Sequence, residues 1–390
     1  MKITPYLSRR TRWAVPGGIA AVVAGAVVAS AITVAQAAPG LPSRTPAQLL
    51  AAVGAQTAPP PPLTGTVVET ATLGIPQLPG ADSPNNITSL LSGSHTVKVW
   101  YADPRHVRLA VPVQGAETDF IRNGNTGWMW QSSQDSVTKF VLPAGDHARA
   151  KASGEWHGKP LTPQEAAQQV LAAAGPSTRV STQSNVMVAG QAAYQLVIAP
   201  KDSRSLVGKI TIAVAGAHPG VPLRVQVFAR GATSPSFQVG YTSISFVRPA
   251  PANFAFTPPR GAHVHTMTPS GMTAPGTMGH GNAPQIIGKD WLAVAVLPAA
   301  DLSGLAGGNA TGLAGPAARS AAGQGGSGGP NENAAIMAAL LKSATKVHGA
   351  WGSGKLLKTS LVSVLITSNG HILVGAVTPQ VLYSAAAQVK

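Results

Sequence analysis

The chain has no cysteine among its 390 residues, which excludes disulfides, thiolate metal sites and cysteine nucleophiles. Acidic residues are also scarce, because 13 Asp and Glu stand against 28 Lys and Arg. No closely spaced carboxylate pair is evident for acid–base catalysis. An H-E-x-x-H pair, a P-loop and a G-x-G-x-x-G that opens a helix are all missing. We therefore predict that the protein is not an enzyme and uses no cofactor.

The formal net charge of +15 could serve to bind a negatively charged partner, which could be a nucleic acid, an anionic lipid or a cell-wall polymer. The sequence has no run of five or more Lys and Arg and no nucleic-acid-binding motif. We therefore expect no nucleic-acid partner and favour a negatively charged envelope surface. The alternative is that the charge only provides solubility.

Residues 1–37 are predicted to be a secretory signal peptide, so the protein is expected to be exported. The segment opens with four basic residues: Lys2, Arg9, Arg10 and Arg12. The uncharged stretch Trp13–Val34 follows, and Ala35-Gln36-Ala37 gives an A-x-A cleavage pattern. The alternative is an uncleaved membrane anchor, because the apolar run is long enough to span a bilayer. Sec and twin-arginine export both stay open.

Residues 42–261 show a helical pattern followed by alternation. Thr45-Pro46-Ala47-Gln48 combines an N-cap, a proline at the first helical position and a capping-box Gln, which predicts a helix over 45–56. Thr162 and Glu165 predict a second helix over 163–174. A period of two predicts strands at 63–73, 94–101, 106–113, 117–122, 127–131, 136–142, 178–182, 192–200, 209–214, 223–229 and 236–246. The short connections favour an antiparallel meander.

Such strands predict a curved antiparallel sheet of about 10–11 strands, with helices covering one face. Two helices are too few to fill a large concave face, so we predict an apolar cavity beneath them; a fully packed core is the alternative. The cavity is predicted to be lined by apolar and aromatic residues of the strands: Val107, Leu109, Ile121, Trp128, Trp130, Phe140, Leu196, Ile198, Ile210, Ile212, Val225 and Val227.

Three motifs in this region resemble, in their order, the LolA-type lipoprotein carriers. Val97–Arg108 resembles a strand, X-Pro turn and strand; Asp119–Pro143 is similar to the hairpins of the family; Phe254–Gly261 resembles its closing strand, F-x-F-T-P-P-x-G. The resemblance covers residues 45–261. It implies an unclosed half-barrel whose helices form a lid over an apolar cavity for acyl chains. In the best-known carriers an arginine before the turn proline latches the lid. Asp103 stands there in this chain, so Arg105 or Arg108 would have to substitute with a different geometry.

Residues 262–285 are predicted to be a Met/His/Gly/Pro linker, and 286–390 a small α+β domain with a disordered Gly/Ala/Ser-rich insert at 303–332. Within it we expect a strand at 286–297, a helix at 333–343, and a hairpin of 355–367 with 371–376. A terminal helix begins at Thr378-Pro379. Leu357–Ala386 resembles the end of the second domain in MucB/RseB proteins. Those proteins join a LolA-like domain to a smaller one and bind an anti-sigma factor outside the cytoplasm.

These observations predict an exported, non-enzymatic protein that holds the acyl chains of a lipid or lipoprotein. The alternative is a regulator of the MucB/RseB type that binds a membrane anti-sigma factor. A third hypothesis is a copper-binding envelope protein, because copper prefers imidazole and thioether ligands. Such groups gather at His263, His265, Met267, Met272, Met278 and His280. Their spacing matches no fixed metal motif, so no metal site is predicted.

Overall fold

The computed structural model describes residues 40–54, 59–74, 92–113, 115–141, 162–173, 175–267, 285–298 and 342–389. The predicted signal peptide at 1–37 and the insert at 303–332 lie outside these ranges. Most of the predicted helix at 333–343 also lies outside them, as do Met272, Met278 and His280. Within the described ranges, no helix has the length and apolar character needed to cross a bilayer.

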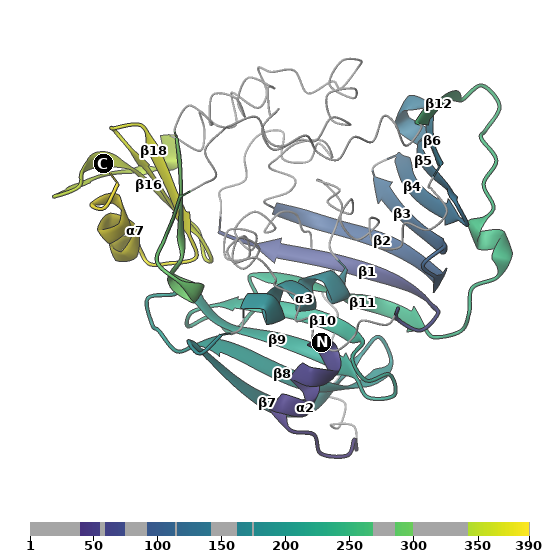
Figure 1. Ribbon diagram of the computed structural model, residues 1–390, viewed down its shortest axis with the longest axis horizontal. Coiled ribbons are helices and arrows are strands. Elements are labelled where there is room, and N and C mark those ends of the chain that lie inside the picture. Colours follow the sequence, from purple (N-terminus) through teal and green to yellow (C-terminus); the bar gives the residue numbers. More distant parts are fainter. Residues whose placement is uncertain are drawn as a thin grey trace, which may run out of the picture.

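A large curved sheet of twelve strands dominates the fold (Figure 1). Its order is β12-β6-β5-β4-β3-β2-β1-β11-β10-β9-β8-β7, and it does not close on itself. Its strands are β1 (Leu63–Thr72), β2 (Ser92–Asp103), β3 (His106–Val113), β4 (Ala116–Asn123), β5 (Thr126–Gln131), β6 (Ser136–Val141), β7 (Thr178–Val188), β8 (Gln191–Pro200), β9 (Val207–Ala215), β10 (Pro222–Ala229), β11 (Phe237–Ser245) and β12 (His263–Met267). The predicted α+β half-barrel is therefore confirmed.

Two helices pack on one face of this sheet, which we call the inner face. Helix α2 (Pro46–Gly54) lies on β7 and β8, and α3 (Pro163–Ala173) lies on β10 and β11 (Figure 1). Both begin with the predicted capping box. The Gln48 N–H donates to the Thr45 hydroxyl at 3.2 Å, and the Glu165 N–H donates to the Thr162 hydroxyl at 3.2 Å. These bonds satisfy N–H groups that a helix start otherwise leaves without partners.

The strand β12 departs from the expectation that a linker begins at 262. His263–Met267 pairs with β6 in parallel, so this edge pair differs from the antiparallel pairs in the rest of the sheet. The chain reaches this edge through residues 248–262, which we call the strap. The strap passes along the side of β3–β6 opposite the inner face (Figure 1).

The strap corrects the expectation that Phe254–Gly261 is a closing strand. Its start forms a 3-10 turn, η2 (Pro251–Phe254), and no strand is assigned between Ser245 and His263. Pro251, Pro258 and Pro259 have no N–H to donate to a ladder, which explains why this segment does not pair. The strap is instead held by its aromatic side chains. Phe254 is buried and its ring lies 5.8 Å from that of His106.

A second sheet of six strands follows, in the order β13-β14-β18-β17-β16-β15. Its elements are β13 (Gln285–Ile287), η4 (Asp290–Leu292), β14 (Val294–Pro298), β15 (Thr345–Gly349), β16 (Gly352–Lys358), β17 (Ser363–Thr367), β18 (His371–Gly375) and α7 (Pro379–Ala386). The terminal helix was predicted correctly, and it buries Leu382, Ala385 and Ala386. The expected single strand at 355–367 is wrong. A turn at Thr359 divides it, because the Thr359 hydroxyl accepts hydrogen bonds from the N–H groups of Leu361 and Val362.

The two sheets are joined by hydrogen bonds and by a shared core. Ser205 and Val377 form an antiparallel bridge, and the Trp291 Nε1–H donates to the Thr178 hydroxyl at 2.8 Å. Leu361 and Val362, from the turn between β16 and β17, are buried in the same apolar cluster as the strands of the larger sheet. The smaller sheet therefore completes the core of the larger one at this junction.

Candidate ligand-binding face

The register of the large sheet decides which side chains share a face, because cross-strand partners point to the same side. Leu196 pairs with Ile212, which pairs with Val225, and the same face continues through Val239. Helices α2 and α3 pack against this cluster, so it belongs to the inner face. From β1 the face continues through Val99 and Leu109, to Phe120 and then Met129.

The inner face has two parts that differ in burial. Beneath the helices the predicted cavity residues Leu196, Ile198, Ile210, Ile212, Val225 and Val227 are buried. The first four of them have no exposed surface, at 0% each, so this part is a packed core. On β3–β6 the apolar inner-face side chains are half-buried instead. They are Val107, Leu109, Val111, Phe120, Met129 and Phe140. A patch of partly accessible apolar side chains thus adjoins the packed core.

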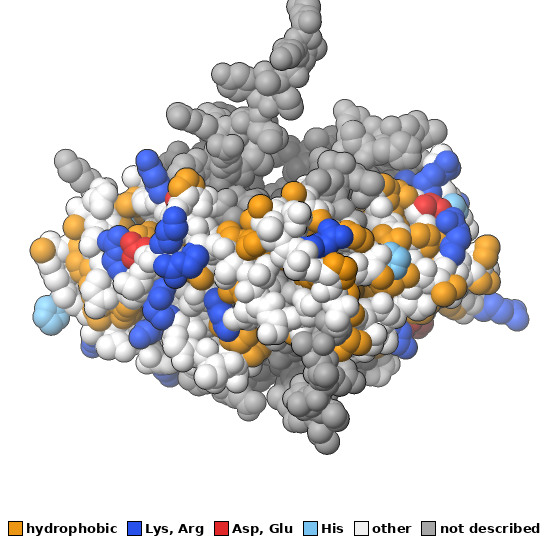
Figure 2. Space-filling view, turned by 90° about the horizontal axis from the view of Figure 1, so that it is seen from below, with side chains coloured by type: hydrophobic (Ala, Val, Ile, Leu, Met, Phe, Trp, Pro, Cys, Tyr) orange, Lys and Arg blue, Asp and Glu red, His pale blue; other side chains and the backbone are white. Residues whose placement is uncertain are grey.

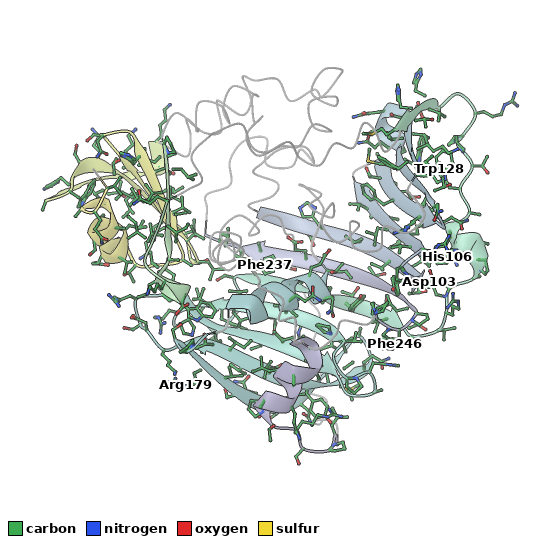
Figure 3. All side chains as sticks on the ribbon, viewed as in Figure 1. Asp103, His106, Trp128, Arg179, Phe237 and Phe246 are labelled. Carbon is green, nitrogen blue, oxygen red and sulfur yellow. The ribbon has the colours of Figure 1, made fainter. Side chains whose placement is uncertain are left out.

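Ile121, Trp128 and Trp130 occupy the opposite, outer face, which corrects their assignment to one cavity with Leu196. Ile121 pairs with Trp128, and Trp130 pairs with Val137, on the side that the strap crosses. The Trp128 ring lies 5.5 Å from that of Phe256 in the strap, and Lys139 Nζ lies 5.2 Å from its centroid. Figure 3 shows Trp128 with His106 and Asp103 on this side. Alternation defines two faces of each strand, but it does not tell which one is inner.

The arginines expected to replace the lid latch do not lie beneath the helices. Arg108 is on the outer face, where its guanidinium bonds to the Asp119 carboxylate and lies 5.3 Å from the Trp100 ring centroid. Arg105 donates to the Asn125 side chain at 3.2 Å, in the turn between β4 and β5. Asp103 accepts hydrogen bonds from the Arg105 N–H and from Arg248 of the strap, each at 2.9 Å. Asp103 therefore fixes the strap and its own turn.

A cation that the sequence reasoning missed lies on the inner face. Arg122 pairs with Val107 on one side and Gly127 on the other, in the same row as Phe140. Its Nε donates to the Gly124 carbonyl at 3.2 Å. Burial and the nearby charge of Arg105 lower the pKa of Arg122, while Asp103 acts in the opposite sense. Alternation along β4 groups Arg122 with Phe120, but only the register with β3 and β5 assigns the two to the inner face.

Tyr101 extends this row on β2, next to Val107. Burial, with a smaller contribution from the Asp103 charge, raises the pKa of the Tyr101 phenol to about 12. The phenol therefore stays protonated at neutral pH and can donate a hydrogen bond. One end of the half-buried apolar face thus carries a guanidinium and a phenol, beside the turns at 103–106 and 123–126.

The outer face has a groove of about 250 Å³ between β2, β1 and β11. Lys98, Trp100, Thr66 and Ile244 are among its lining residues. It lies on the side opposite to the predicted cavity. In the view of Figure 2 the charged side chains on the described surface are mainly basic, in keeping with the excess of Lys and Arg in the sequence.

The described part of the chain contains no group of three or more His, Cys, Asp and Glu residues that could hold a metal ion. His263 and His265 are exposed on β12, and Met267 ends that strand. The other members of the His/Met cluster lie outside the described residues. The copper hypothesis therefore stays an untested alternative.

No protein-family model and no curated protein matches this chain. Among solved structures, it is similar to a chain of the Pseudomonas aeruginosa MucA/MucB complex, with 13% identity and a TM-score of 0.36, over 87% of this chain and 95% of that one. It is also similar to the Mycobacterium tuberculosis lipoprotein LppX, with 12% identity and a TM-score of 0.25, over 50% and 92%. A LolA superfamily protein of Nitrosomonas europaea matches with 9% identity and a TM-score of 0.22, over 55% and 99%. Both kinds of protein that the motifs resemble are thus among the matched structures. All three TM-scores are below 0.5, so the ligand has to be inferred from the residues themselves.

Proposed function

We propose that this protein binds an acyl chain of a lipid or lipoprotein on the half-buried inner face of β3–β6. The observation that carries the proposal is the patch formed by Val107, Leu109, Phe120 and Met129. It is apolar, it adjoins the packed core, and its members keep accessible surface. An acyl chain laid on such a face gains about 0.8 kcal/mol for each CH₂ group that it buries.

Fluorescence titration of the mature chain with an environment-sensitive fatty acid tests this proposal. Met129→Glu should abolish binding, because it places a carboxylate in apolar surroundings on the inner face. Trp130→Glu is the matched control, since it is the next residue on β5 and points to the outer face. Circular dichroism checks that both variants are folded. Probe binding that survives Met129→Glu, or that is lost only with Trp130→Glu, would contradict the placement of the ligand.

The regulator hypothesis predicts a different result in the same system. Pull-down from envelope extract should recover a single-span membrane protein, whereas a carrier should recover acylated molecules, which mass spectrometry of the purified protein identifies. A wild-type chain that binds no fatty-acid probe would leave the regulator as the better hypothesis. A ligand on the inner face is not expected to quench the fluorescence of Trp128 and Trp130 by contact, because both lie on the outer face.

A further inference from the structure

Arg122 and Arg105, at one end of the inner face, have little negative charge beside them to balance their two positive charges. The Arg122 Nε donates a hydrogen bond to the Gly124 carbonyl. Arg105 Nη2 lies 3.6 Å from the point that a Cβ atom would occupy if Gly124 had a side chain. Two guanidinium groups therefore converge on one turn. Asp103, whose charge acts on Arg122, already accepts a hydrogen bond from Arg248 and contacts His106, each at 2.9 Å.

Like charges that converge in this way repel one another, and the repulsion is larger where water is partly excluded. The lowered pKa of Arg122, caused by burial and by the Arg105 charge, agrees with this description. A bound anion would relieve both effects, and guanidinium groups bind carboxylate and phosphate oxygens with paired N–H donors. The Tyr101 phenol, in the same row, can add one further donor.

The position of these groups relates the anion to the proposed acyl chain. Arg122 shares its face and its row with Val107 and Phe140, and Leu109 and Phe120 form the next row. Gly127, between Arg122 and Phe140, has no side chain to fill the row. A molecule lying along these strands would thus place its tail on apolar side chains and its head beside the arginines.

We infer that the ligand is an anionic amphiphile whose carboxylate or phosphate head contacts Arg122 and Arg105 while its acyl chain lies on Val107 and Leu109. This inference rests on the proposed function and adds the chemical class of the head group. It assigns to Arg122 the role of selecting a charged ligand over a neutral one with the same chain.

A matched pair of probes tests the inference: a fluorescent polyene fatty acid and its methyl ester, titrated at pH 8. The two have the same chain and differ by one charge. We expect the wild type to bind the acid more tightly than the ester. Arg122→Gln should weaken acid binding by roughly tenfold, as expected for the loss of a charge-assisted hydrogen bond, and leave the ester unchanged. Arg122→Lys should keep part of the preference, because it keeps the charge.

Lys98→Gln is the matched control, because it removes an exposed cation from the outer face of β2, in the same sheet. It should leave both affinities unchanged. Equal binding of acid and ester by the wild type, or a preference that survives Arg122→Gln, would overturn the inference and leave the acyl-chain proposal standing. Saturable binding of inorganic phosphate alone would show a free-anion site and overturn the link to the chain. Failure of both probes to bind would overturn the proposed function itself.

Discussion

At the scale of single residues, the outer face is organised by one buried carboxylate. Asp119 is 3% exposed and bonds to Arg108, whose guanidinium lies over Trp100. Burial raises the pKa of Asp119 to about 6, although the Arg108 charge acts to lower it. Within the described residues, the Asp119 Oδ1 and the Arg108 Nε are buried without a hydrogen-bond partner. This arrangement fixes the ring of Trp100 beside the outer groove at a cost in stability.

The raised pKa of Asp119 has a consequence for the pH dependence of folding. The folded state binds this proton more tightly than the unfolded state, so the group's stabilising contribution is complete below its unfolded pKa of 3.8 and is lost as pH rises through about 6. Asp119→Asn removes that dependence. The free energy of unfolding of the variant, minus that of wild type, should therefore increase by on the order of 1 kcal/mol from pH 4 to pH 7. Urea unfolding at several pH values measures it.

Asp202→Asn provides the control for this prediction. Hydrogen bonds from Arg204 lower the pKa of partly exposed Asp202 to about 2, so the folded state keeps this group ionised throughout that pH range, and the unfolded state protonates it appreciably only near pH 4. The difference from wild type should be nearly flat for Asp202→Asn, with only a small change near pH 4 and of the opposite sign. A flat difference for Asp119→Asn as well would show that Asp119 titrates with an ordinary pKa.

At the scale of elements, alternation and turn chemistry predicted the strands well. The expected strand at 192–200 is β8 (Gln191–Pro200), and that at 106–113 is β3 (His106–Val113). The face of each strand could not be predicted, because it depends on the register with the neighbours. Met129 and Trp130 are both apolar and adjacent, and only the pairing of β5 with β4 assigns Met129 to the inner face. Trp130, the larger of the two, lies on the outer face, which the strap crosses. The sequence did not indicate that this face is covered, because part of the strap was expected to be a strand.

The difference between the two parts of the inner face is measurable as stability. Ile212 is fully buried on β9, so Ile212→Ala leaves a cavity and should cost about 2–5 kcal/mol of unfolding free energy. Leu109, on the same face of β3, is half-buried. Leu109→Ala should cost well below that range, because its site already meets solvent. Urea denaturation followed by circular dichroism compares the two. Equal losses would mean that β3 is as tightly packed as β9.

At the scale of the whole molecule, the junction between the two sheets determines whether they unfold together. Residues of both sheets meet there. Leu361 is 1% exposed, within the cluster of the larger sheet, and the Ser360 N–H donates to the Leu73 carbonyl at 2.9 Å. Arg230 donates from Nε to the Ser205 carbonyl at 2.9 Å, which holds the segment that bridges to Val377. A core completed by both sheets favours one cooperative transition, since neither sheet keeps its burial alone.

Leu361→Asp tests this cooperativity, because it introduces a charge into the shared apolar cluster, where an unpaired carboxylate is strongly disfavoured. We expect the wild type to unfold in a single calorimetric transition and the variant to unfold in two, with the smaller sheet melting first. Leu356→Ala is the control. Leu356 packs in the separate cluster of the smaller sheet, so its truncation should lower the transition temperature without dividing the transition. Two transitions already present in wild type would show that the junction is a contact between independent units. The acyl-chain proposal would then have to hold for the larger sheet alone.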